Sequence, residues 1–192
     1  MDNLRYYNTY DGIQSFPYKI IRHLFDNEKI WKLIKYDDNE ALSPSKANLT
    51  LEEKTSLIWS GQLDANYDID SSKYRVFQQP LTDDTFIERN TQLRVYEYKT
   101  IPIDRVKGIV LMRIAIITHS KLNGLIDTQT TRIGELKQEI IKSIVGEQIG
   151  GIGDIFYDRT PNTEIGSTLG LNDKKNYFGY VITVGTWVSI EK

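Results

Sequence analysis

The sequence predicts an α+β fold, in which a mixed, mostly antiparallel β-sheet is flanked by helices in a two-layer single domain with an extended arm and long loops. Residues 91–99 and 109–120 have strand patterns and are joined by a turn that contains Pro102 and Gly108. Residues 177–189 alternate as another long strand. Between them, apolar residues recur at helical spacing, namely Ile133, Leu136, Ile140, Ile141 and Ile144. Because this stripe must leave water, we expect the helix to lie across the sheet.

Length, charge and cysteine content narrow the class of protein. The 192 residues fit one domain, and the formal net charge of −2 shows no basic excess of the kind that nucleic-acid-binding domains carry. The absence of cysteine excludes disulfides, thiolate metal ligands and a cysteine nucleophile. No apolar run reaches the roughly 18 residues that a membrane-spanning helix needs, and the first residues lack a secretory signal. We expect a soluble intracellular protein without membrane contact.

The first half of the chain predicts an arm, short helices and a strand. Residues 1–15 show no period and are expected to form an extended arm. Apolar residues within 16–34 indicate one broken helix or two short ones, expected on the sheet face opposite the later helix. After a polar loop at 36–48, Thr50 and Glu53 match a capping box that starts a helix over 51–60, which Gly61 ends. Residues 62–72 are typical of an acidic loop, 74–79 of a strand and 86–88 of a brief extended segment.

The second half predicts the sheet and its covering helix. Strand 91–99 places Arg94, Tyr96 and Tyr98 on one face, which we expect to be exposed, and strand 109–120 is apolar on both faces, as in the centre of a sheet. Residues 127–131 favour a helix start and Gly146 a helix end, and Arg132 is expected to point away from the apolar stripe. Residues 150–153 predict a turn and 154–157 a strand. The polar loop at 159–176 is expected to be mobile until it contacts a neighbour.

One pair of residues suggests chemistry. His119 ends the central strand, and Asp127 follows eight residues later, so an enzyme reading would make His119 a general base oriented by Asp127 or Asp104. Such a site also needs a nucleophile or a metal, and neither Thr118 nor Ser120 lies in a nucleophile motif. We therefore favour a structural role for His119 and expect no catalytic residues.

Cofactor and metal motifs are weak in this sequence. The acidic grouping of Asp64, Asp68 and Asp70 lacks the glycine and terminal glutamate of a calcium-binding loop. The glycine-rich stretch at 146–153 follows a helix instead of preceding one, so it does not match a phosphate-binding loop. We expect neither a metal nor a cofactor.

Aromatic content points to contacts with other proteins. The chain contains 12 tyrosines and 3 tryptophans, and such residues dominate protein interfaces because they bury a large area and keep a polar tip. Three of the tyrosines, at positions 6, 7 and 10, lie in a segment without a core pattern, which makes them better interface candidates than the tyrosines of the sheet. The candidate interface residues are Tyr6, Tyr7, Tyr10, Arg94, Tyr96, Tyr98, Arg159, Lys174 and Lys175.

The order of elements also carries a resemblance. An arginine-and-tyrosine strand precedes a long apolar strand that ends Ile117-Thr118-His119-Ser120, and an acidic residue at 127 and a helix with Arg132 follow. Over residues 16–187 this order resembles tailed-bacteriophage tail terminator and neck proteins, which are small α+β proteins that form rings at the head–tail junction. The resemblance implies a self-assembled ring, most often a hexamer, in the tail or neck of the virion, assembled in the host cytoplasm.

The same resemblance implies the partners. The ring would join the tail tube protein to the neck or connector proteins, and DNA would pass through its lumen without specific binding. A near-neutral chain is compatible with such a lumen, because dense lysine and arginine contacts would hold the duplex. The alternatives are a head-side connector or adaptor protein, a small His-dependent enzyme and a monomeric binding module.

Overall fold

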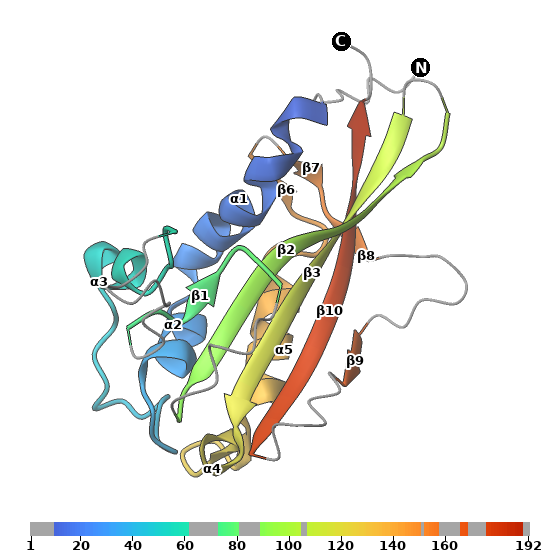
Figure 1. Ribbon diagram of the computed structural model, residues 1–192. Coiled ribbons are helices and arrows are strands. Elements are labelled where there is room, and N and C mark those ends of the chain that lie inside the picture. The colour runs from blue at the N-terminus through green and yellow to red at the C-terminus, as the bar shows by residue number, and fades with distance from the viewer. Residues whose placement is uncertain are drawn as a thin grey trace.

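The computed structural model describes residues 10–61, 73–80, 89–104, 107–150, 152–157, 166–168 and 176–189. It is an α+β fold with a mixed, mostly antiparallel sheet, as the sequence predicted (Figure 1). Sheet order is β1-β2-β3-β10-β8, with β9 also on β10, and β1 is the parallel strand. These strands are β1 (Val76–Phe77), β2 (Thr91–Pro102), β3 (Lys107–His119), β8 (Phe156–Tyr157), β9 (Gly166–Thr168) and β10 (Tyr177–Ser189).

Three long antiparallel strands form the centre of the sheet. The pairing of β10 with β3 is unbroken from Tyr177 opposite His119 to Ser189 opposite Lys107. The pairing of β2 with β3 contains a register shift between Glu97 and Lys99, which is a β-bulge. The predicted central strand and the predicted strand 177–189 are therefore confirmed, and the hairpin strands extend beyond the predicted bounds.

The main helices lie on one face of this sheet. They are α1 (Phe16–His23), α2 (Glu28–Lys35) and α5 (Arg132–Ile144), with the 3-10 turn η2 (Leu24–Asp26) between the first two. Both α1 and α2 contact β2 and also α5, and α5 contacts β3 and β10. The expectation that the first helices cover the opposite face is therefore wrong. The apolar stripes of all three helices meet in one core instead.

The core fills the space between these helices and one side of the sheet. Because paired strand residues share a face, the helix-facing side chains of the long strands can be read from the register. They include Leu93, Val95, Val110, Met112, Ile114, Ile116, Ile182, Val184 and Val188, all nearly or fully buried. The indole of Trp31 is fully buried as well, and its Nε1 donates to the Leu24 carbonyl at 2.9 Å.

The first described residues are not an extended arm. Residues Tyr10–Ser15 form a 3-10 helix, η1, and Ile13 belongs to the buried core with 3% exposure. The prediction of an extended arm through residue 15 is therefore wrong for this part. The apolar side chain of Ile13 is what anchors the segment, and residues 1–9 lie outside the described residues.

The predicted capping box is confirmed at helix α3 (Leu51–Ser56). The Thr50 hydroxyl accepts from the Glu53 amide at 3.2 Å, and the Glu53 carboxylate accepts from the Thr50 amide at 2.8 Å. The helix is shorter than predicted, because Ile58 already bridges to Val76 beside β1. The predicted strand over 74–79 is likewise reduced to β1, and residues 62–72 and 86–88 lie outside the described residues.

Short elements connect the long ones. Helix α4 (Ser120–Asn123) follows β3, β4 (Gly124–Leu125) pairs with β5 (Thr130–Thr131), and β6 (Gln148–Ile149) pairs with β7 (Gly153–Asp154). Gly146 ends α5 with φ of 81°, as predicted. The predicted loop 159–176 contains β9, so that part is a paired strand instead of a free loop. No helix in the described part of the chain is long and apolar enough to cross a membrane.

Candidate functional site

The sheet has a second face, on which none of the described helices lies. The strand register assigns to it the residues that alternate with the core residues, among them Tyr96, Arg113 and Trp187. Two further aromatic rings, those of Tyr98 and Phe156, contact this face. We name these five residues the aromatic face. Tyrosine, tryptophan and arginine are the residue types that most often dominate binding energy at interfaces.

An arginine stack forms one half of the aromatic face. The guanidinium carbon of Arg113 lies 3.4 Å from the ring centroid of Tyr98, and Arg113 pairs across the strands with Tyr96. The bulge between Glu97 and Lys99 brings Tyr98 to the side of Arg113. Tyr98 keeps 47% exposure, so its ring remains available to a partner. Cation–π stacking of this kind orders the Tyr98 ring and leaves part of it exposed to solvent.

An aromatic pair forms the other half. The rings of Phe156 and Trp187 are 6.1 Å apart with an interplanar angle of 42°, and Trp187 is 44% exposed. A Cβ atom at Gly185 would lie 2.8 Å from the Phe156 ring and 3.2 Å from the Leu111 side chain. The glycine therefore allows the Phe156 ring to approach the backbone of β10 closely. Residues from β2, β3, β8 and β10 thus meet on one face, where Tyr98 and Trp187 are exposed and Tyr96, Arg113 and Phe156 are partly buried.

The predicted interface residues fall in different places. Tyr96 and Tyr98 lie on the aromatic face, and Tyr98 is exposed as expected. Tyr10 begins η1, but its side chain is not among the described parts. Outside the described residues lie Tyr6, Tyr7, Arg159, Lys174 and Lys175.

Arg94 is a correction, because its side chain is fully buried instead of exposed. Its guanidinium carbon lies 4.3 Å from the centroid of the Phe77 ring, and its nitrogens donate to the Pro80 carbonyl at 2.8 Å and to Gln92 Oε1 at 3.1 Å. Burial lowers the pKa of Arg94 to about 10, so the side chain stays charged at neutral pH. Arg94 supports the sheet from its second face and is not available to a partner.

Sequence reasoning missed Arg113, Phe156 and Trp187 as surface candidates. The alternation of residues 177–189 does place Trp187 on one side of its strand, but periodicity alone does not reveal which side lacks a helix. Phe156 lies on a two-residue strand whose pairing with Val184 and Gly185 is decided by the tertiary fold. The bulge that turns Tyr98 toward Arg113 leaves no mark in the sequence.

The suspected pair of His119 and Asp127 is not brought together by a hydrogen bond. His119 Nδ1 accepts from the Lys121 amide at 3.2 Å and so caps α4, and its ring packs edge-on against Tyr177 with centroids 5.2 Å apart. Asp127 Oδ2 accepts from the Leu42 amide at 2.7 Å. Burial lowers the pKa of His119, and the nearby Arg89 and Lys121 charges lower it further. His119 therefore caps the helix that follows it, and Asp127 holds the backbone of a loop 85 positions away.

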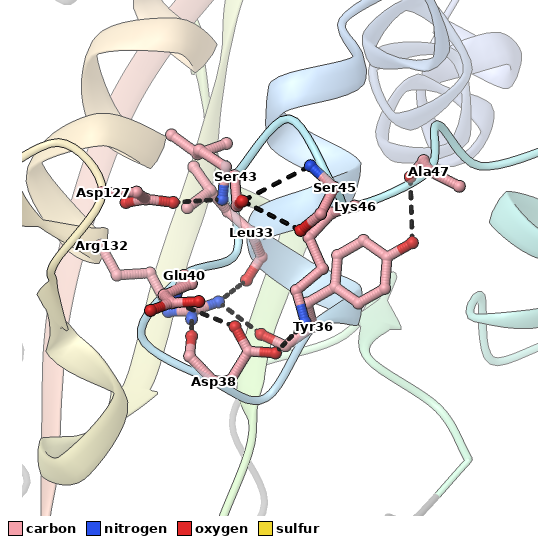
Figure 2. Close-up of polar contacts among 11 residues, drawn as sticks. Leu33, Tyr36, Asp38, Glu40, Ser43, Ser45, Lys46, Ala47, Asp127 and Arg132 are labelled. Carbon is pink, nitrogen blue, oxygen red and sulfur yellow. Dashed lines mark hydrogen bonds and ion pairs between the residues drawn. The ribbon is translucent and has the colours of Figure 1, made fainter.

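Arg132 is a second correction, because it is fully buried instead of pointing away from the core. Its Nε donates to the Leu122 carbonyl at 2.9 Å, and its terminal nitrogens donate to the carbonyls of Leu33, Tyr36 and Asp38 (Figure 2). Burial lowers the pKa of Arg132, while the charges of Asp37, Asp38 and Asp127 oppose that shift. The side chain ties the end of α2 and the following loop to α5.

A sequence comparison gives the family. A protein-family model described as YomW matches residues 27–186, which is most of the chain. The chain belongs to the YomW family. The family name is of a prophage type, so this is a phage-associated protein. No curated protein matches the chain.

The YomW match includes most of the aromatic face. It contains Tyr96, Tyr98, Arg113 and Phe156 and stops one residue before Trp187. Helix α1 and η1 lie before the match. The part of this YomW chain that carries the sheet and α5 is therefore the part that the family shares.

The helix side carries a depression of about 470 Å³ that is lined mainly by charged and polar residues of α1, α2 and α5. There the Glu139 carboxylate accepts from Asn27 at 3.1 Å and lies 3.5 Å from Lys29 and 3.4 Å from Lys142. The charge and hydrogen-bonding capacity of the Glu139 carboxylate are therefore used by its neighbours in this depression. Among the described residues no cluster of three or more histidine or acidic side chains has the arrangement of a metal site.

Proposed function

We propose that this phage-associated protein is a structural virion protein that forms a ring at the head–tail junction or the tail end, in the role of a tail terminator or neck protein. The phage-type family and the α+β fold with its long antiparallel strands support this proposal. So does the resemblance of the order of elements to such ring proteins. In this role the protein connects neighbouring parts of the virion and catalyses no reaction.

The aromatic face is the observation that carries the proposal. Tyr98 and Trp187 expose 47% and 44% of their surfaces on a sheet side where none of the described helices lies. A connecting protein of this kind needs well-ordered aromatic and arginine side chains at its contacts, because such side chains supply most of the binding energy at interfaces. Here strands fix them in place, with Arg113 stacked on Tyr98 and Phe156 packed on Gly185.

The proposed ring contacts copies of the same chain at its sides and other virion proteins at its two ends. Each copy repeats one heterologous contact with the next until the ring closes, most often as a hexamer. The two ends of the ring contact the tail tube protein and the neck or connector proteins. DNA passes through the lumen without specific binding, for which the net charge of −2 is suitable.

Purified phage particles test the proposal. We expect mass spectrometry to detect this chain in particles, and a cryo-electron microscopy map to place it in a rotationally symmetric ring between tail tube and head. A position against the tube favours the tail terminator, and a position against the portal favours a head-side connector protein. Absence of the chain from particles, or a site without rotational symmetry, would contradict the proposal.

A further inference from the structure

Building on the proposed ring, we propose that the aromatic face of one copy receives Leu51 and Glu52 of the α3 helix of a second copy. The partner is thus another molecule of this chain, which presents an apolar side chain beside an acidic one. The contact joins a sheet face to a helix and does not extend the sheet from copy to copy.

Apart from β1 and β3, none of the described strands pairs with β2, and the exposed part of its edge is unsuited to sheet extension. Beyond its pairing with β1 at Leu93 and Arg94, this strand carries the bulge between Glu97 and Lys99, an exposed Lys99 and Pro102. Bulges, lysines and prolines are the features that prevent edge strands from pairing with other chains. On the other side of the sheet, β8 and β9 already pair with β10. The face of the sheet is therefore better suited to a neighbour than its edges.

The charge of this face selects an acidic partner. The register of β2, β3 and β10 places basic residues on the second face and, among the described residues of these strands, no aspartate or glutamate. The basic residues that a partner can reach are Lys99, Lys107 and Arg113, since the guanidinium of Arg94 is buried against Pro80 and Gln92. Of these, Lys99 is exposed beside the exposed ring of Tyr98. A complementary surface needs carboxylates next to an apolar side chain.

Leu51 and Glu52 supply that combination on the same molecule. Leu51 is 60% exposed although it is a large apolar residue, and Glu52 and Glu53 beside it are exposed. The capping box at Thr50 fixes the backbone of this segment, so the leucine is held in a defined position. Helix α3 lies beside β1, at the left of Figure 1, and β1 pairs with β2 only at Leu93 and Arg94. Lys99 lies five residues further along β2, so the two complementary surfaces are separate places on one molecule. Such an arrangement allows a head-to-tail contact that closes a ring.

The cysteine-free sequence allows a direct test by disulfide trapping. The single variants Glu52→Cys and Lys99→Cys are mixed and oxidised, both as concentrated purified protein and, in a double variant, within assembled particles. We expect a disulfide between residue 52 of one copy and residue 99 of another, and a ladder of linked copies for the double variant. Lys142→Cys replaces Lys99→Cys in the control, since Lys142 is 57% exposed and lies on the helix side.

Charge exchange provides a second test. Glu52→Lys or Lys99→Glu alone is expected to weaken self-association at least fivefold in analytical ultracentrifugation or in ring formation on particles, as about 1 kcal/mol of lost attraction predicts. The double variant Glu52→Lys with Lys99→Glu is expected to recover association, because the attraction is restored with reversed signs. Lys142→Gln is the control on the helix side; it removes a lysine charge without adding a carboxylate beside Glu139 and should leave self-association unchanged.

The outcomes separate this inference from the proposed function. Particles that contain a symmetric ring of this chain, yet yield no disulfide between residues 52 and 99, overturn the contact and leave the ring standing. If the chain is absent from particles, the proposed function fails, and absence of the disulfide in concentrated protein overturns the contact as well. Binding of a single-stranded oligonucleotide that Trp187→Ala abolishes, again without the disulfide, would assign the face to nucleic acid and overturn the proposal.

Discussion

The ring of Phe156 lies against Gly185, at a distance where even a methyl group on the glycine would meet ring carbons at 2.8 and 3.1 Å. This contact joins the short strand β8 to the long strand β10 and holds one side of the aromatic face. It also makes residue 185 sensitive to substitution, because a side chain at this position would overlap the Phe156 ring.

Replacing Gly185 by alanine is therefore expected to destabilise the protein by about 1–3 kcal/mol, as overpacking typically does. Urea unfolding followed by circular dichroism measures the change. Gly124→Ala is the matched control, because a Cβ there meets nothing within 4 Å. In a Phe156→Ala background the Gly185→Ala change should cost much less. An equal cost in both backgrounds would show that the ring is not the obstacle.

Replacing Arg132 by methionine is expected to cost about 3–5 kcal/mol, because four backbone carbonyls, two of them buried, lose a charged donor. The loop after α2 should loosen first, which amide hydrogen exchange at residues 36–40 would detect. Lys142→Met, at a position 57% exposed, is the control and should stay within about 0.5 kcal/mol of the wild type. A stable Arg132→Met protein with a protected loop would contradict this role.

Replacing His119 tests both its cap and its pH response. Alanine should cost about 1 kcal/mol or less through the lost α4 cap, whereas asparagine should retain most of the stability. The folded pKa of His119 lies below its usual value of 6.5, so the unfolded chain binds the proton first. The stabilisation is thus fully present above pH 6.5 and declines as pH falls toward the folded pKa.

Urea unfolding between pH 5 and 8, in wild type and His119→Asn, measures that decline. The variant should lack the part of the slope that arises just below pH 6.5. The same variants distinguish the structural role from the enzyme alternative. If the role is structural, ring assembly should persist in His119→Asn. Assembly with a lost hydrolytic or transfer activity would favour the enzyme alternative.

Replacing Ile114 or Ile116 by aspartate is expected to abolish folding. Both side chains have 0% exposure in the core, and an unpaired buried charge costs several kcal/mol against a total stability of roughly 5–15 kcal/mol. Circular dichroism and solubility report the result. Ile126→Asp, at a position 66% exposed, is the control and should fold normally. A soluble, folded Ile114→Asp protein would contradict the position of β3 at the centre of the sheet.

The sequence by itself determined the elements whose signal is local. Alternation over residues 177–189 defined β10 to the residue, helical spacing located α5, and the pair Thr50 and Glu53 located the start of α3. Gly146 marked the end of α5 because its positive φ is a property of one residue and its neighbours. In each case the physical cause lies within a few residues of the element, so the sequence contains all of it.

The tertiary structure alone decided what covers each surface. Periodicity shows that a helix has an apolar stripe but not which sheet face it meets, so α1 and α2 were expected on the wrong side. The burial of Arg132 depends on carbonyls that lie 94 to 99 positions away, at Asp38, Tyr36 and Leu33. The aromatic face arises in the same way, since β2, β3, β8 and β10 meet only when the chain folds and leaves Tyr98 and Trp187 exposed together.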